Sequence, residues 1–279
     1  MRMKTSTHTA LLQLDSVGLR LGAHSFGPFS LHITPGERIA ILGPSGAGKS
    51  TLLKLMSREC KPTTGQVSFH GQRLADWSLS DLSRRRAVLP QSGDVAFGLQ
   101  ADLVVGLGRV ARVHDPHLAD IVQASATLAH AAGLLRRRFD TLSGGEQARI
   151  QLARVFAQLW NAHDGLILVD EPLAALDPGL QLDLLDSLEA YAFARHHGLV
   201  AILHDINQAM LGFDRLLLLK GGKLVADLPS SADAVPALES LYGIALGCTT
   251  DIQGTLVIAP LRKPARRPAP AGVMAWACA

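Results

Sequence analysis

Gly43-Pro44-Ser45-Gly46-Ala47-Gly48-Lys49-Ser50-Thr51 is the stretch of this sequence that decides the fold. The stretch matches the pattern G-x-x-x-x-G-K-[ST] at every fixed position. An Ile- and Leu-rich run at residues 38–42 precedes it, which is typical of a strand buried on both faces, and residues 52–56 are mostly good helix formers. The sequence therefore predicts a phosphate-binding loop between a strand and a helix.

The residue types in this loop suit a bound anion. Three glycines remove the Cβ atoms that would hinder a backbone bending around phosphate oxygens, so successive N–H groups can face the anion. Lys49 is expected to lie across the β- and γ-phosphates, and Ser50 to bind Mg²⁺. A Gly-rich turn with a chance Lys-Ser pair is the competing interpretation, but the flanking strand and helix argue against it. We expect all nine residues of the loop to take part in binding a nucleotide.

The composition indicates a globular protein. With 279 residues, 48% of them hydrophobic, the chain can bury a sizeable core as one large domain or a domain with a subdomain. The net charge of +3 is small and the basic residues form no long tract with aromatics, so we expect no nucleic-acid partner. Three distant cysteines without metal-ligand spacing favour a reducing compartment. Without a signal peptide or a run of about 20 apolar residues, we expect any membrane contact to come through another chain.

Apolar runs predict a parallel sheet with two additions. Runs at residues 166–169 and 199–203 flank a helix-like segment at 180–195, which is the pattern of a β-α-β unit. Alternating apolar residues and turn signals at 11–33 predict two or three antiparallel strands before the loop. Residues 80–142 carry recurring leucines with little β-branched clustering, which predicts a mostly helical insert.

The run at 166–169 ends in two carboxylates, Asp170 and Glu171. The carboxyl end of a parallel strand is where a nucleotide crevice is expected. Asp170 is expected to hold Mg²⁺, directly or through water, and Glu171 to orient and polarise an attacking water. Adjacent acids at a strand end are more often an exposed turn, but the preceding phosphate loop favours the catalytic interpretation.

Leu142-Ser143-Gly144-Gly145-Glu146 opens a helix with one apolar face. Ser143 and Glu146 have the spacing of a capping box, so a well-capped helix explains these two residues fully. It does not explain the two consecutive glycines, which lower helix stability but leave the N-terminal amides bare for an anion.

The ordered set of motifs resembles the nucleotide-binding domain of ATP-binding-cassette proteins. The similarity covers residues from about 11 to about 228. It is carried, in order, by the phosphate loop, Gln91 after Ala-Val-Leu-Pro, Leu142 to Glu146, Asp170-Glu171, Leu176-Asp177 and His204-Asp205.

The resemblance implies a role for each matching residue. Gln91 would sense Mg²⁺ and the attacking water and face a membrane subunit, while His204 would contact the γ-phosphate of ATP. Asp177 would communicate across a dimer. Ser143, Gly144 and Gly145 would complete the ATP site of the opposite protomer. By themselves, a single Gln and a single His would more often be ordinary surface or core residues.

The resemblance also implies the fold class: an α/β P-loop NTPase (RecA-like) core with a mainly parallel sheet, an N-terminal antiparallel β-subdomain and an inserted α-helical subdomain. We expect a single domain over residues 1–262, with the helical subdomain at about 80–158. The Pro- and Arg-rich segment 263–279 is expected to be a disordered tail.

One position departs from the family pattern. The family usually has an aromatic residue that stacks on adenine just before the first Gly turn, and this place is held by Leu21. Adenine is then expected to rest on an aliphatic side chain, or on His24 or Phe26 instead. The departure concerns base recognition and not the phosphate chemistry.

One copy of each motif without a membrane segment is typical of the ATPase subunit of a bacterial importer, at the cytoplasmic face of the inner membrane. The expected partners are polytopic permease subunits, a second copy of the chain and, indirectly, a periplasmic substrate-binding protein. Three segments are similar to the ATP-binding subunits of hemin importers, close relatives of the iron-siderophore and cobalamin group: residues 84–92, 151–160 and 171–177. The short appendix around residues 241–243 and 255–260 is similar too.

Two other classes of nucleotide-binding protein are alternatives. A soluble cassette ATPase of DNA repair or translation would carry a long coiled-coil insert or a second cassette, and a P-loop kinase or GTPase would not need Leu-Ser-Gly-Gly or His204. Residues 91–112, which include Phe97, Leu99, Leu103 and Val104, are expected to form part of the docking surface for the membrane subunit. The arginine runs 84–86 and 136–138 are expected to be solvated helix ends.

Overall fold

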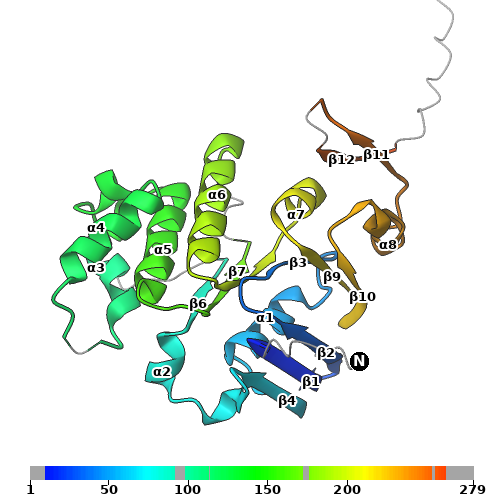
Figure 1. Cartoon of the computed structure of the whole chain (residues 1–279), viewed down its shortest axis with the longest axis horizontal. Helices are drawn as coiled ribbons and strands as arrows, with labels where there is room; N and C mark the ends of the chain where they lie inside the picture. Colours follow the sequence, from blue (N-terminus) through cyan, green and yellow to red (C-terminus); the bar gives the residue numbers. More distant parts are fainter. Residues whose placement is uncertain (1–9, 92–97, 113, 172–175, 253–254, 262–279) are drawn as a thin grey trace, which may run out of the picture.

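The computed structural model describes residues 10–91, 98–112, 114–171, 176–252 and 255–261. Its centre is a sheet of six strands in the order β10-β9-β3-β8-β7-β6, of which all but β10 run parallel to their neighbours (Figure 1). The strands are β3 (Arg38–Leu42), β6 (Arg86–Leu89), β7 (Leu166–Asp170), β8 (Gly198–Ile202), β9 (Arg215–Lys220) and β10 (Lys223–Pro229). This confirms the predicted mainly parallel sheet.

A second sheet precedes and follows the phosphate loop in sequence. Its four strands have the order β2-β1-β4-β5 and pair antiparallel throughout. They are β1 (Leu12–Leu21), β2 (His24–Ile33), β4 (Thr64–Phe69) and β5 (Gln72–Arg73). The predicted N-terminal antiparallel subdomain is therefore present.

Helices cover the parallel sheet and extend to one side of it. Three of them, α3, α4 and α5, pack against one another as a separate group in the chain between β6 and β7 (Figure 1). The described helices are α1 (Lys49–Ser57), α2 (Leu79–Ser83), α3 (Ala101–Gly106), α4 (Leu118–Leu128), α5 (Gly144–Leu159), α6 (Pro178–Ala194), α7 (Ile206–Gly212) and α8 (Val235–Tyr242).

The helical insert is present, but one strand was not expected inside its range. β6 lies within residues 80–158 and pairs with β7, with Leu89 beside Val169. Its four residues begin with the last arginine of the run 84–86 and carry no long apolar signature, so pairing with β7 decides their conformation. The outer domain limits remain a prediction, and the proposed tail at 263–279 lies outside the described residues.

The two faces of the parallel sheet bury two different cores. On β3, Ile39 and Ile41 belong to the cluster shared with α1 and the antiparallel sheet, whereas Ala40 and Leu42 belong to the cluster shared with α5, α6 and α8. Because successive side chains of a strand point to opposite faces, a continuous apolar run is needed to fill both cores.

A short C-terminal unit packs beside the sheet. It consists of α8 followed by a hairpin of β11 (Leu246–Thr250) and β12 (Leu256–Pro260) (Figure 1). Leu246 and Ile258 are buried in the same core as α8, so the hairpin is anchored through its apolar side chains.

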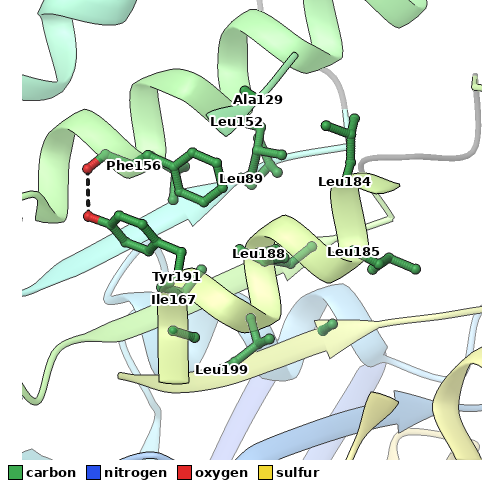
Figure 2. Packing of buried hydrophobic residues seen from close by; sticks show 14 of the residues in the cluster. Leu89, Ala129, Leu152, Phe156, Ile167, Leu184, Leu185, Leu188, Tyr191 and Leu199 are labelled. Atoms are coloured by element: carbon green, nitrogen blue, oxygen red, sulfur yellow. Dashed lines mark hydrogen bonds between the residues drawn. The ribbon is translucent and has the colours of Figure 1, made fainter. Parts of the chain in front are cut away.

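A buried hydrogen bond joins the helical group to the sheet-covering helix α6. The Tyr191 hydroxyl on α6 donates to the Phe156 carbonyl on α5 at 2.7 Å, and the two rings lie 4.6 Å apart (Figure 2). Phe156 is in the last turn of α5, where carbonyls lack an intrahelical partner. Burial raises the pKa of the Tyr191 phenol, which therefore stays protonated and able to donate.

We expect Tyr191→Phe to lower the free energy of unfolding by about 1–3 kcal/mol, because it leaves a buried carbonyl unsatisfied. In a chain of this size about 1 kcal/mol corresponds to roughly 2–4 °C in Tm, measured by thermal denaturation. Phe193→Leu, at a side chain that is 84% exposed on the same helix, is the matched control and should leave Tm unchanged. Equal Tm values for Tyr191→Phe and the natural chain would contradict this interpretation.

Candidate functional site

The phosphate loop joins β3 to α1, as expected. Gly46 and Gly48 have φ of 75° and 94°, a region that favours glycine. Gly48 caps α1 without a side-chain hydrogen bond, and the amides of Gly46, Gly48 and Lys49 have no hydrogen-bond partner among the described residues. Bare amides at a helix N-terminus carry a partial positive charge, so the loop is shaped to receive an anion.

A turn that sequence analysis did not connect with the site supports this loop. The Gly222 amide, between β9 and β10, donates to the Ala47 carbonyl at 3.0 Å, and the Gly222 carbonyl accepts from Gly27 at 2.7 Å. A Cβ atom at Gly43 would lie 2.3 Å from the Leu219 carbonyl oxygen, so only glycine fits there. The Gly221-Gly222 pair, which follows an apolar run, is the feature of the sequence that could have indicated this turn.

Lys49 folds back over the loop. Its ammonium donates to the Gly43 carbonyl at 2.8 Å and the Pro44 carbonyl at 3.3 Å, and the residue is only 7% exposed. Its charge has no carboxylate partner within ion-pair distance among the described residues. A buried ammonium held only by neutral carbonyls favours a nearby anion.

Asp170 lies next to the start of α1. The Ser50 hydroxyl donates to the Asp170 carboxylate at 3.3 Å. Burial raises the pKa of Asp170, the bond from Ser50 opposes this rise, and the neighbouring charge of Glu171 adds to it. The negative charge of the carboxylate is therefore not fully balanced by its surroundings, and a cation at this position would stabilise the ionised form.

Glu171 is held between two residues from other parts of the chain. Gln91 donates to its Oε2 at 3.0 Å, and the His204 Nε2 lies 2.5 Å from its Oε1. Glu171 itself has φ of 49°, which is uncommon for a residue with a side chain. Strained backbone of this kind persists where the surrounding structure holds it, and it is concentrated at functional sites.

Most of these residues line one cavity of about 380 Å³, whereas Gly43, Pro44 and Asp170 do not. Residues 45–51 of the loop line it, together with Phe26, Gln91, Glu171 and His204. Because β6, β7 and β8 run parallel to β3, their carboxyl ends bring Gln91, Glu171 and His204 to the loop. The structure thus brings together the residues expected to contact the phosphates.

The predicted site residues at the starts of α5 and α6 also lie outside this cavity. Ser143 caps α5 in a complete capping box with Glu146, and Gly144 and Gly145 are its first two residues. Asp177 caps α6, its side chain accepting from the Leu180 amide at 3.1 Å. Within one chain, none of these four is a cavity-lining residue.

The residue of the antiparallel sheet that lines the cavity is not the one expected by position. Leu21 is 50% exposed and does not line the cavity, and neither does His24. Phe26 does, and its ring covers Gly48 so closely that a Cβ atom there would lie 2.8 Å from it. Of the three alternatives left open by the sequence, the geometry favours Phe26.

The oxygen atoms at this site suit Mg²⁺ bound together with phosphate. Among the described residues, no group of three or more His, Cys, Asp or Glu is placed to hold a metal ion by itself. Mg²⁺ commonly binds through one or two protein oxygens together with phosphate oxygens and waters. The Ser50 hydroxyl and the under-compensated Asp170 carboxylate fit that pattern.

The chain is similar to known families and proteins. Residues 26–174 match the model of the family described as ABC transporter. The chain is 40% identical over 243 residues to the hemin import ATP-binding protein of Pseudomonas putida, covering 84% of this chain and 93% of that protein. It is 41% identical over 226 residues to the hemin import ATP-binding protein of Methylobacillus flagellatus, covering 77% and 82%.

Solved structures show the same fold. A metal-chelate type ABC transporter in an inward-facing conformation aligns with a TM-score of 0.76 at 23% identity, covering 91% of this chain and 98% of that chain. A dimeric ATP-binding cassette bound to ADP and Pi aligns with a TM-score of 0.70 at 24% identity, covering 79% and 99%.

The described part of the chain contains no helix with the length and apolarity needed to cross a bilayer. The fold, the phosphate loop and the acidic strand end agree with the family match, which extends over more than half of the chain. The chain therefore belongs to the ABC transporter family, as an ATP-binding and ATP-hydrolysing subunit.

Proposed function

We propose that this chain powers a bacterial importer whose cargo is hemin. The observation that carries the hydrolytic part is the Glu171 carboxylate, held by Gln91 and His204 at the cavity lined by the phosphate loop. The cargo follows from the relatives named as hemin import proteins, which are about 40% identical over most of their length. Uptake of an iron-siderophore or of cobalamin is the closest alternative.

Each residue around the cavity has a proposed role. The loop amides and Lys49 bind the β- and γ-phosphates of ATP, since both supply positive charge at a helix N-terminus. Ser50 and Asp170 hold Mg²⁺, assisted by Gln91, and the ion would neutralise charge that develops on the phosphate oxygens. Glu171 orients and polarises the attacking water, and His204 contacts the γ-phosphate.

The site is completed by a second copy of the chain. Ser143 is exposed at the start of α5, where the helix presents amides and two glycines but does not reach the cavity of its own chain. We assign Ser143, Gly144 and Gly145 to the ATP bound by the partner protomer, and Asp177 to communication across the dimer. Such an arrangement makes hydrolysis depend on dimer formation.

A groove in the helical group is the proposed docking surface for the permease. Its volume is about 930 Å³, and it includes exposed Leu103, Leu107 and Val110. Val104, which was expected on this surface, is instead buried in the core, and Phe97 lies outside the described residues. An exposed apolar groove suits a partner helix, which the permease would supply. The chain would then lie at the cytoplasmic face of the inner membrane. Through the permease it would serve a periplasmic substrate-binding protein.

Transport by the reconstituted complex tests the cargo. The chain is combined in proteoliposomes with the permease encoded beside it and the matching binding protein, and hemin, ferrichrome and cobalamin are offered separately. We expect ATP-dependent accumulation of hemin, abolished in the complex that carries Lys49→Ala. Uptake of ferrichrome or cobalamin instead would reassign the cargo. Hydrolysis without uptake of any of the three would favour a soluble ABC ATPase that is not coupled to transport.

Glu171→Gln tests the catalytic carboxylate. The change keeps the size of the side chain and removes its charge, so ATP binding should persist while turnover falls by about 10²–10⁴-fold. ATP held unhydrolysed should then trap a dimer, visible by size-exclusion chromatography with ATP and absent without it. A variant that hydrolyses ATP at the natural rate would refute the assignment of Glu171.

Asp170→Asn distinguishes the proposed role of Asp170 in binding Mg²⁺ from the effect of this residue on the stability of the folded chain. Because burial raises the pKa of Asp170 above 3.8, its ionisation opposes folding, and this penalty grows as the pH rises through the range just above that value. Asn can still accept from Ser50, so without nucleotide the variant should melt at a higher temperature than the unmodified chain at neutral pH, with the gain shrinking in acid. Stabilisation by Mg²⁺ and ATP should be lost. A variant that is less stable without nucleotide would contradict this account.

A further inference from the structure

The His204 segment lies between two anchors. On one side, β8 ends at Ile202, and the Leu203 amide donates to the Ile41 carbonyl of β3 at 3.2 Å. On the other side, Asp205 caps α7, its Oδ1 accepting from the Asn207 amide at 2.7 Å and the Gln208 amide at 3.3 Å. The His204 side chain is 59% exposed, so packing around the ring does little to fix it. Its position depends on where α7 begins.

α7 is too short to be stable by itself. It has seven residues, and isolated helices of fewer than about 12 residues are marginal in water. Tertiary contacts must therefore hold its first turn in place. Its buried side chains, Ala209 and Met210, follow that turn, and its first residue, Ile206, is only partly buried.

One contact that holds the first turn comes from the C-terminal hairpin. The Asn207 side-chain amide donates to the Ile258 carbonyl at 3.0 Å, and the Asn207 Oδ1 accepts from the Ile258 amide at 2.8 Å. One side chain thus satisfies both backbone groups of a β12 residue, as a neighbouring strand would. Figure 1 shows α7 and the hairpin in the same region of the molecule. Because the Ile258 side chain is 4% exposed, the hairpin is a firm anchor.

The rest of the C-terminal unit also reaches the nucleotide end of the sheet. Tyr242, the last residue of α8, interacts with the backbone of Gly43, the first residue of the phosphate loop. The Lys220 ammonium at the end of β9 donates to the Ser240 carbonyl of α8 at 3.1 Å. The unit is therefore in contact with two segments that form the site, the loop and α7.

From these contacts we infer that Asn207 is a positioning residue for hydrolysis: by tying the first turn of α7 to the backbone of Ile258, it sets His204 against Glu171. The inference rests on the proposed role of His204. It gives the C-terminal hairpin a catalytic purpose, because displacement of β12 would pass through Asn207 and Asp205 to the adjacent His204. A misplacement of about 1 Å at a reacting centre can lower a rate by as much as about 10²-fold.

The test is a double-mutant cycle in the full-length chain. Asn207→Ala removes both hydrogen bonds to Ile258, and His204→Ala removes the side chain that they position. We expect Asn207→Ala to lower kcat for ATP hydrolysis about tenfold while KM changes less than about twofold, since the loop that binds the phosphates is untouched. In the His204→Ala background, Asn207→Ala should cause no further loss, because coupled residues are not additive.

Two further variants complete the experiment. Gln208→Ala is the matched control, since it lies in the same turn of α7 and its side chain forms no hydrogen bond with a described residue. It should leave kcat unchanged. If Asn207→Ala does not fold, as judged by circular dichroism, Asn207→Asp takes its place. The aspartate keeps the acceptor for the Ile258 amide and loses the donor, so a smaller loss of kcat with the same dependence on His204 is expected.

The outcomes separate the two proposals. An unchanged kcat in the Asn207 variant, or an equal fold-loss with and without His204, would overturn the positioning role. If His204→Ala alone hydrolyses ATP at the rate of the unmodified chain, the role proposed for His204 itself is refuted. A loss that depends on His204 supports both.

Discussion

The parallel pairing of β3, β8 and β7 is the constraint on which the site depends. β3 and β8 are in register at Ile41 and Ile202, and β8 and β7 at Ile202 and Asp170. All three strands therefore end at the same level. Because each strand is followed by a different functional segment, one edge of the sheet carries the phosphate loop, the two carboxylates and the His204 segment. Gln91 follows β6 at the same edge.

That edge holds several energetically unfavourable features, and two of them favour a charged ligand. The Lys49 ammonium contacts neutral carbonyls, the Asp170 carboxylate is half-buried, and Glu171 has a positive φ. Isolated charges and strained residues in a protein interior lower its stability unless a ligand or neighbour compensates them. The triphosphate would compensate the Lys49 ammonium, and Mg²⁺ would compensate the Asp170 carboxylate. The same features that oppose folding would therefore favour binding of the nucleotide.

The helical group and the C-terminal unit connect this edge to other surfaces. The helical group is attached to α6 through the buried bond between Tyr191 and Phe156, and it carries both the Ser143 helix start and the apolar groove. The C-terminal unit contacts α7 through Asn207. Each attachment joins a surface that a partner could contact to a segment that contributes to the nucleotide site. In the proposed importer, these attachments are the physical routes by which the permease and the nucleotide would influence one another.

The sequence by itself determined the features that depend on neighbours in the chain. The phosphate loop, the capping box of Ser143 and Glu146, and the carboxylates at the end of an apolar run follow from local residue patterns. The family resemblance extended these to Gln91, Asp177 and His204. It did not predict β6 as a strand, because four residues carry too little periodicity without their partner β7.

Tertiary structure alone decided the contacts between distant segments. Three of them could not be read from the chain: the placement of Glu171 between Gln91 and His204, the cover of Gly48 by Phe26 and not Leu21, and the bond from Asn207 to Ile258. Each depends on strand register and on how helices pack over the sheet, and no short stretch of sequence specifies either. Local chemistry thus determined which residues could bind a nucleotide, and long-range packing determined how they are oriented, because a side chain's direction depends on both of the elements it joins.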